Sequence, residues 1–207
     1  LFVIRGEAGM ETTASHIAGP LREQEQIASC RSIGVTELEF PDHSEGAIVA
    51  DVQLRLDIAR AMRKHRPEVL ISINFRESWG GPSWNHAGHR AVGLALLGSV
   101  RDTANSWVAQ DLEDPACDGV RFVAFNASPQ STHSVDVTAT VEDGVRSLLC
   151  HREYLRSLGQ TNEEAAAFLR AEARDAGSAA GAEYAAQFEV LRPWPQGRYR
   201  WTLLMVL

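Results

Sequence analysis

The strongest constraint on the fold is an alternation of short apolar runs with longer amphipathic segments. The runs 1–4 and 69–73 are continuously apolar, a pattern typical of buried parallel strands. Further strands are predicted at 120–125 and 135–138, and 184–191 is expected to return to the sheet. Alternating strands and helices predict a parallel sheet with helices on both faces. Right-handed crossovers then give a Rossmann-like, three-layer α/β/α fold with a mostly parallel sheet.

Helix boundaries are predicted from caps and breakers. Pro20 is placed in a first helical turn, Asp51 at an N-cap, and Gly159 just past a helix end. The predicted helices are 20–34, 51–65, 86–104, 141–158 and 163–175, the last capped by Asn162. Residues 36–40 alternate polar and apolar side chains, which predicts a strand with one exposed face. Residues 176–182 are expected to form a linker.

Composition excludes several classes of function. The 207 residues suffice for one domain, 1–207, in which 160–207 is read as a helical region and a tail. A formal net charge of −7 argues against a general nucleic-acid binder, and no apolar run approaches the roughly 20 residues that span a bilayer. Cys30, Cys117 and Cys150 are far apart and form no Cys-x-x-Cys, which predicts free thiols in a reducing cytoplasm.

Two histidines stand where the loop 74–85 turns into a helix. If His86 and His89 are both helical, they are three residues apart and share a face. Neutral imidazole is the commonest nitrogen ligand for zinc, and ligands of α/β sheets bind beyond the carboxyl ends of strands. On this spacing alone, a capping histidine beside a solvated one is the favoured alternative to a zinc site.

The pair belongs to a longer series of short motifs in a fixed order. They are Arg5-Gly6-Glu7-Ala8-Gly9 and the segments 21–25, 33–35, 66–69, 85–93, 135–138 and 148–152. Their order and spacing resemble the LmbE-like (PIG-L) family of zinc-dependent N-deacetylases. The resemblance covers residues 1–159, with a weaker echo at 181–188.

The resemblance implies a role for each histidine. In that family, zinc is held by a His-Pro-Asp-Asp motif and by the last His of a His-x-Asp-His motif. The first His of the second motif stabilises the oxyanion or protonates the leaving amine. Carried onto this chain, His89 is implied as a zinc ligand and His86 as the catalytic acid or oxyanion partner.

Three further residues near the start of the chain match family patterns. Arg22 matches an arginine of an Arg-x-x-Glu pattern and is expected to bind a substrate carboxylate or acetate through two hydrogen bonds. Glu25 is expected to orient Arg22, with an ordinary i,i+3 surface pair as the alternative. Glu7 ends the first strand, as in the family's Gly-Glu, and a turn-stabilising role is the alternative to a catalytic one.

Two tryptophans and an aspartate are expected to contact the substrate. Trp79 and Trp84 lie in the loop 74–85, where an aromatic face suits the apolar side of a sugar ring. The alternative is a hydrophobic patch that closes the loop. Asp42 falls in a loop that often lines the substrate cleft in the family. His151 matches a family histidine that either faces the site or packs.

The chain departs from the family pattern at two points. The His-Pro-Asp-Asp motif is absent, so we expect the chain to be N-terminally incomplete, lacking a first strand and helix of roughly 30 residues. A natural variant that has given up zinc is the alternative. Gly88 stands where the family has Asp, which removes an adjacent carboxylate that would orient His86.

These features together predict a Zn²⁺-dependent hydrolase that removes the N-acetyl group from an N-acetylated amino sugar or its conjugate. The alternative is a non-catalytic, metal-free domain of the same fold that binds such a sugar conjugate. The expected partner is that small molecule, with neither nucleic acid nor a membrane span, and a homo-oligomer is an open option. A nucleotide-binding Rossmann protein is disfavoured because no Gly-x-Gly-x-x-Gly follows a strand.

Overall fold

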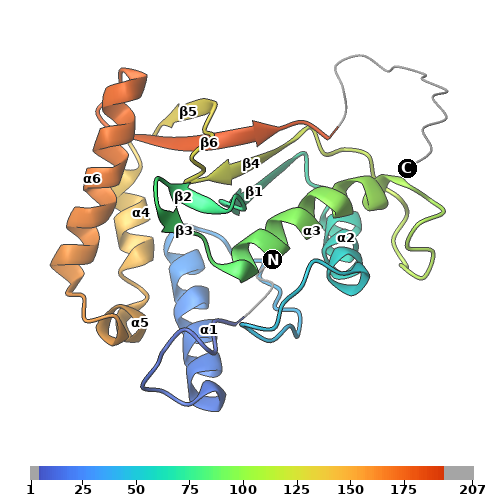
Figure 1. Cartoon of the computed structure of the whole chain (residues 1–207), viewed down its shortest axis with the longest axis horizontal. Coiled ribbons are helices and arrows are strands. Elements are labelled where there is room, and N and C mark those ends of the chain that lie inside the picture. Colours follow the sequence, from blue (N-terminus) through green and yellow to red (C-terminus); the bar gives the residue numbers. More distant parts are fainter. Residues whose placement is uncertain (1–4, 194–207) are drawn as a thin grey trace.

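The computed structural model describes residues 5–193 (Figure 1). Its helices are α1 (Ser15–Ser32), α2 (Val52–His65), α3 (Ala87–Ala104), α4 (Val141–Leu148), α5 (Arg152–Ser157) and α6 (Asn162–Ala180). Its strands are β1 (Val69–Ile73), β2 (Ser78–Gly80), β3 (Ser83–Trp84), β4 (Phe122–Asn126), β5 (His133–Asp136) and β6 (Ala185–Leu191). The strand predicted at 1–4 and the tail from residue 194 lie outside the described residues.

The main sheet has the strand order β1-β4-β6-β5. Strands β1 and β4 run parallel, with Val69 opposite Phe122, whereas β6 is antiparallel to both β4 and β5. The α/β fold class is therefore confirmed, but the described sheet is mixed rather than mostly parallel. Gly181 ends α6 in a left-handed conformation (φ 75°), and the chain then enters the sheet as β6 between β4 and β5, antiparallel to both.

Helices α2 and α3 pack on each other and on β4 to form the main core. Val123 and Phe125 of β4 are fully buried there, beside Leu54 of α2. A side chain at Gly93 would overlap the Phe75 ring, so this glycine lets α3 approach the segment after β1 closely. Helices α4 and α6 pack together at the other side of the molecule, beside β5 and β6 (Figure 1).

Strand β1 forms where it was predicted, but it is buried on one face only. Val69, Ile71 and Ile73 are 39%, 69% and 41% exposed, whereas Leu70 packs against the core. Alternate residues of a strand face opposite sides of the sheet. The prediction of a fully buried strand was wrong, because no element within residues 5–193 covers the odd-numbered face of β1.

The strand predicted at 36–40 is absent from the described chain. These residues have no regular secondary structure and join no sheet. Glu39 instead binds the end of α2 through its side chain, accepting hydrogen bonds from Lys64 and His65 at 2.5 and 2.8 Å. The segment is therefore attached to α2 through the Glu39 side chain, and not to a sheet through backbone hydrogen bonds.

Helix α1 begins at Ser15, earlier than the predicted start at Pro20. Ala14 is its extended N-cap, and the N–H groups of Ile17 and Ala18 donate to the Ala14 carbonyl at 2.8 and 2.9 Å. The first turn is thus closed before the proline, which sits inside the helix. Proline is favoured in the first turn of a helix, but here the helix begins five residues before it without a side-chain cap.

The single helix predicted at 141–158 is two helices, α4 and α5. His151 has a non-helical backbone (φ −84°, ψ 54°) at the N-cap of α5, which breaks the continuous hydrogen-bond ladder. The break turns the His151 side chain toward α1, where it meets Arg22. A pattern of apolar residues is continuous across this break, so periodicity alone does not reveal it.

Helix α6 is longer than predicted. Thr161, rather than Asn162, is its N-cap and forms a capping box with Glu164. The helix runs on to Ala180, so most of the linker predicted at 176–182 is helical. Small residues alone do not end a helix, since alanine favours it and serine is tolerated. The helix ends only where Gly181 adopts the left-handed conformation.

The loop predicted at 74–85 contains the small hairpin β2–β3, which leads directly into α3 (Figure 1). Helices α2 and α3 match their predicted bounds, and Asp51 caps α2 by accepting from the Leu54 N–H. Across residues 5–193, no helix is both long and apolar enough to cross a membrane.

Candidate active site

His86 begins α3 as its N-cap. Its backbone is extended (φ −61°, ψ 138°), and its Nδ1 accepts a hydrogen bond from the Gly88 N–H at 3.1 Å. His86 therefore caps the helix, as in the alternative interpretation of a capping histidine beside a solvated one. The two rings still come together, because the centroids of His86 and His89 are 5.6 Å apart. The backbone N–H of Gly88 orients the imidazole at the position where the family pattern has a carboxylate.

His89 lies one turn into α3 and is half-buried. Its Nδ1 is 3.0 Å from the side-chain oxygen of Asn85, which is itself only 1% exposed. Burial lowers the pKa of His89, the nearby His86 lowers it further, and the Glu45 carboxylate opposes both. The neutral imidazole is therefore the favoured form of His89, and this is the form that accepts a proton or ligates a metal.

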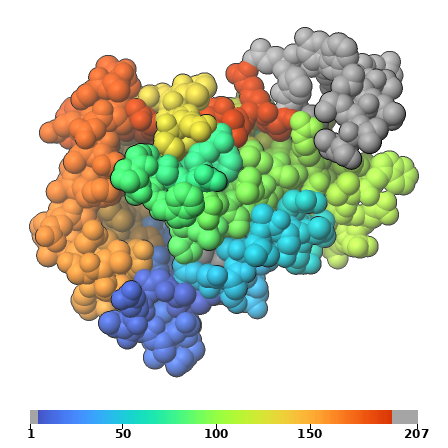
Figure 2. All heavy atoms as spheres, in the orientation of Figure 1, coloured from blue at the N-terminus to red at the C-terminus, as the bar shows by residue number. Residues whose placement is uncertain are grey.

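The hairpin β2–β3 places both predicted tryptophans beside this pair. The Trp79 ring meets His89 edge-on, with 5.7 Å between centroids and an interplanar angle of 84°. Trp84 is 67% exposed, and the Arg90 guanidinium lies 5.3 Å from its ring centroid. The green atoms of the hairpin and α3 occupy the centre of the face shown in Figure 2.

Arg22 forms a second cluster with residues from α1 and α5. Its guanidinium lies 3.6 Å from the Tyr154 ring centroid, and its Nη1 donates to His151 Nδ1 at 3.4 Å. Glu25 is 3.7 Å from the same nitrogen, so the predicted Arg22–Glu25 pair is present. Burial, followed by the Arg22 charge, lowers the pKa of His151 to about 4.

Glu7 ties the start of the described chain to the loop that carries Glu45. Its Oε1 accepts from the Glu45 N–H at 2.5 Å, while the Ala8 N–H donates to Glu45 Oε2 at 2.6 Å. Because the Glu45 charge acts on His89, this loop pair connects the Glu7 region to the histidine region. The geometry fits the turn-stabilising alternative for Glu7.

Four buried polar atoms around these clusters have no hydrogen-bond partner. They are Glu7 Oε2, Arg22 Nε, Glu25 Oε2 and Arg90 Nε. Unpaired buried polar groups are costly, so such atoms call for a bound water or ligand group. An anion that reached Arg22 Nε would satisfy one of them, as the predicted carboxylate-binding role of Arg22 requires.

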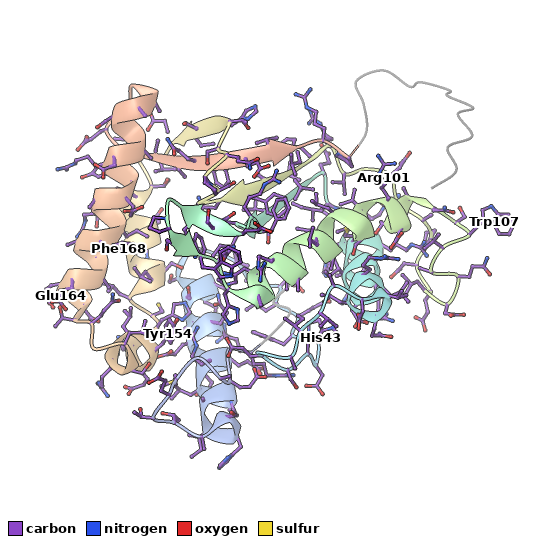
Figure 3. All side chains as sticks on the ribbon, in the orientation of Figure 1. His43, Arg101, Trp107, Tyr154, Glu164 and Phe168 are labelled. Atoms are coloured by element: carbon purple, nitrogen blue, oxygen red, sulfur yellow. The ribbon has the colours of Figure 1, made fainter. Side chains whose placement is uncertain are left out.

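Asp42 lies in a different place from the histidine pair. Its fully exposed carboxylate pairs with Arg5 Nη1 at 2.8 Å. It lines a surface groove with His43 and with Asp57 of α2. Figure 3 shows His43 and Tyr154 on opposite sides of α1. The substrate-binding role predicted for Asp42 therefore requires a ligand that extends beyond both clusters.

The donor set in residues 5–193 does not fit a complete zinc site. No group of three or more His, Cys, Asp or Glu side chains in this part of the chain could hold a metal ion. A catalytic zinc usually has three protein ligands and an open position. His89 offers one suitable nitrogen, and His86 has committed its Nδ1 to capping α3.

Three residues of these clusters were missed by reasoning from sequence. Asn85 is the first residue of the motif 85–93, but no role was predicted for it. It lies four residues before His89, close enough to contact the imidazole ring. Nothing in the sequence indicates a role for Tyr154 in the site, because an aromatic residue in a helix usually packs in the core. Glu45 sits in a polar loop, and its link to Glu7 depends on a contact between distant segments.

Comparison with known proteins places this site in a family context. Residues 1–99 match the family model described as PIG-L: GlcNAc-PI de-N-acetylase. The resemblance to the PIG-L (LmbE-like) family is confirmed over that stretch. The PIG-L match includes the histidine pair, the hairpin and α1. No curated protein matches the chain at a significant level.

Solved structures share the fold of this chain at low sequence identity. The N,N'-diacetylchitobiose deacetylase from Pyrococcus horikoshii, in complex with an inhibitor, has a TM-score of 0.77 and 19% identity, over 92% of this chain and 71% of that one. A conserved protein from Thermus thermophilus has a TM-score of 0.73 and 20% identity, over 95% and 82%. The 4-carboxy-2-hydroxymuconate hydratase from Pseudomonas putida has a TM-score of 0.70 and 14% identity, over 94% and 84%.

Proposed function

We propose that this protein is an N-deacetylase, a hydrolase that cleaves the amide of an N-acetylated amino sugar or its conjugate. The observation that carries the proposal is the pair His86–His89 at the junction of the hairpin and α3, inside the stretch that matches the PIG-L model. An imidazole pair of this kind supplies both partners that amide hydrolysis needs, a donor for the carbonyl oxygen or leaving amine and an acceptor.

Each side chain has a role in this proposal that its contacts support. His86 donates to the developing oxyanion or to the leaving amine. His89, favoured in its neutral form, accepts a proton or ligates the metal. Arg22 binds a carboxylate or the acetate product through its unpartnered Nε. Trp84 is exposed enough to stack on a sugar ring.

Zinc is the cofactor of this proposal, with His89 as one ligand. The residues that the structure describes do not complete the ligand set. The proposed roles are therefore limited to the protein's own side chains, and no step of the reaction is assigned to the metal.

The fold by itself does not select the reaction. A deacetylase and a hydratase both share it with this chain, at TM-scores of 0.77 and 0.70. The family match is what favours the deacetylase, together with the histidine pair at the expected place. A hydratase would act on a carbon–carbon double bond, and it would release no acetate from an N-acetylated sugar.

A second candidate is a metal-free domain that binds the sugar conjugate without cleaving it. Two observations favour it: Gly88 replaces the aspartate of the family pattern, and residues 5–193 lack a three-ligand metal cluster. Trp84, Trp79 and Arg22 would then form the binding surface, and the histidines would be structural.

The deciding experiment measures acetate release from a panel of N-acetylglucosamine conjugates, with zinc supplied and zinc per chain determined by elemental analysis. We expect release by the native protein and its loss in His86→Gln and His89→Gln. His133→Gln, at an exposed position of β5, is the matched control and should keep full activity. Conjugate binding without acetate release would establish the metal-free binding domain, and neither binding nor release would reject both candidates.

A further inference from the structure

The side chain of Asn85 is held in one orientation by the backbone around it. Its Nδ2 donates to two carbonyl oxygens, those of Asn74 and Arg76, both at 2.9 Å. Both N–H bonds of the amide are thereby used. The opposite orientation would place Asn85 Oδ1 against two carbonyl oxygens, which have no proton to donate. The oxygen of Asn85 therefore faces His89.

This orientation determines which nitrogen of His89 carries the proton. Asn85 Oδ1 can only accept, and it lies 3.0 Å from His89 Nδ1. His89 must then donate from Nδ1. A neutral imidazole has one N–H, so the remaining nitrogen, Nε2, carries a free lone pair.

The carbonyl groups that orient Asn85 are themselves anchored to the sheet. Asn74 is fully buried, receives the Arg76 N–H on its Oδ1 at 2.9 Å, and donates its own backbone N–H to Asn126 of β4 at 2.8 Å. Arg76 binds the buried carboxylate of Glu189 in β6 through both Nε and Nη2. Ser128 donates to the same carboxylate at 2.6 Å. The frame around Asn85 is thus anchored to two strands of the sheet, β4 and β6.

His86 is held in the opposite state by a different contact. Its Nδ1 accepts from the Gly88 N–H, so in the neutral ring the proton is on Nε2. The two imidazoles therefore differ. One offers a lone pair at Nε2 and the other offers an N–H at the same atom.

We propose that Asn85 is the positioning residue of the site, and that it fixes His89 in the Nδ1–H tautomer so that Nε2 is the atom available to accept a proton. The chemical meaning of this assignment rests on the proposed deacetylase function. The complementary tautomers give the pair one acceptor and one donor before substrate binds, which is the preorganisation that amide hydrolysis uses.

The first test is the tautomer in the native protein. Nitrogen-15 labelling of histidine and two-bond proton–nitrogen correlation spectra, recorded at pH 8 with and without a chelator, report which ring nitrogen is protonated. Spectra of His86→Gln and His89→Gln assign the signals. We expect Nδ1–H for His89 and Nε2–H for His86, which serves as the internal control. An Nε2–H tautomer for His89 would overturn the proposal, whatever any variant does.

The second test uses Asn85→Ala, with far-ultraviolet circular dichroism to establish that the variant is folded. Loss of the acceptor should convert His89 to a mixture of tautomers and lower kcat about 10–100-fold, with KM changed much less. A folded variant that retained the Nδ1–H tautomer and native kcat would overturn the proposal. Native Nδ1–H with no acetate release by any protein would leave Asn85 assigned and reject the deacetylase instead.

Discussion

The guanidinium carbon of Arg22 lies over the ring of Tyr154, 3.6 Å from its centroid. This contact joins α1 to α5 and holds the arginine beside His151 and Glu25. The ring covers a face of the guanidinium, and stacking of this kind leaves the N–H groups in the guanidinium plane able to donate hydrogen bonds. Arg22 is therefore both a packing residue and a candidate anion ligand, and its two roles can be separated by substitution.

Tyr154→Leu should destabilise the protein by about 1–2 kcal/mol, because a partly desolvated cation–π contact is lost with the aromatic area. Tyr154→Phe should cost much less, since the ring remains. Urea denaturation of both variants measures the difference. Tyr184→Leu is the control for a looser ring contact, since Arg174 lies 5.2 Å from that ring centroid and donates to the exposed Tyr184 hydroxyl at 2.6 Å. Equal losses for Tyr154→Leu and Tyr154→Phe would show that the ring contact contributes nothing.

The stability of the protein should fall as pH decreases from about 6.5 to about 4, in part because of His151. Its pKa in the folded state is about 4, lowered from 6.5 by burial and by Arg22. In that window the unfolded chain binds a proton that the folded chain does not, so acid favours unfolding, by about 1–3 kcal/mol at the lower limit. Above pH 6.5 this residue adds no slope.

His151→Gln should remove that contribution, because glutamine does not titrate. Denaturation midpoints measured at half-unit pH steps would show a flatter profile for the variant than for the native protein. His133→Gln controls for the loss of a histidine at an exposed site. A profile for His151→Gln parallel to the native one contradicts the assignment.

Trp84→Ala should raise KM for the sugar conjugate about 3–30-fold and leave kcat and Tm nearly unchanged. The ring is 67% exposed, so its removal costs little packing, whereas stacking on a sugar depends on the aromatic face. Trp107→Ala is the control, because Trp107 is 83% exposed and lies at the far end of the molecule from α1 (Figure 3). Equal effects of the two substitutions on KM would exclude Trp84 from the binding surface.

Glu189→Gln should destabilise the protein by about 2–4 kcal/mol. The carboxylate is 3% exposed and is bound by both Arg76 and Ser128, and its neutralisation leaves the part-buried Arg76 guanidinium without its partner. Arg76 lowers the pKa of Glu189, so this stability is present near neutral pH and is lost as pH falls through the lowered pKa. Thermal unfolding measures the loss, with Glu142→Gln, in an exposed pair with Arg170, as the control expected to change little.

The parts of the fold that the sequence predicts well are those with local signals. Helix α2 has Asp51 as its cap and an apolar stripe, and its bounds match. The segment 36–40 and the direction of β6 could not be predicted, because both depend on distant partners. Glu39 is held by α2, and β6 is placed by its antiparallel pairing with β4 and β5.

The candidate site likewise has features that the sequence predicts and features that it does not. The spacing of His86 and His89 is visible in the sequence, and the rings do come together. The orientation of Asn85 is not visible, because it depends on the carbonyl groups of Asn74 and Arg76, which the hairpin folds back toward α3. Arg22 was identified through a motif, whereas the ring of Tyr154 beneath it comes from a helix far along the chain.

The face of β1 that residues 5–193 leave exposed has a practical consequence for work with the protein. Val69, Ile71 and Ile73 form an apolar stripe on a strand, and such stripes adhere to one another and to hydrophobic dyes. Concentrated samples should therefore cloud on storage and bind anilinonaphthalene sulfonate without being unfolded. Ile71→Lys, in the middle of the stripe, should delay the clouding, which makes it the first background in which to prepare material for spectroscopy.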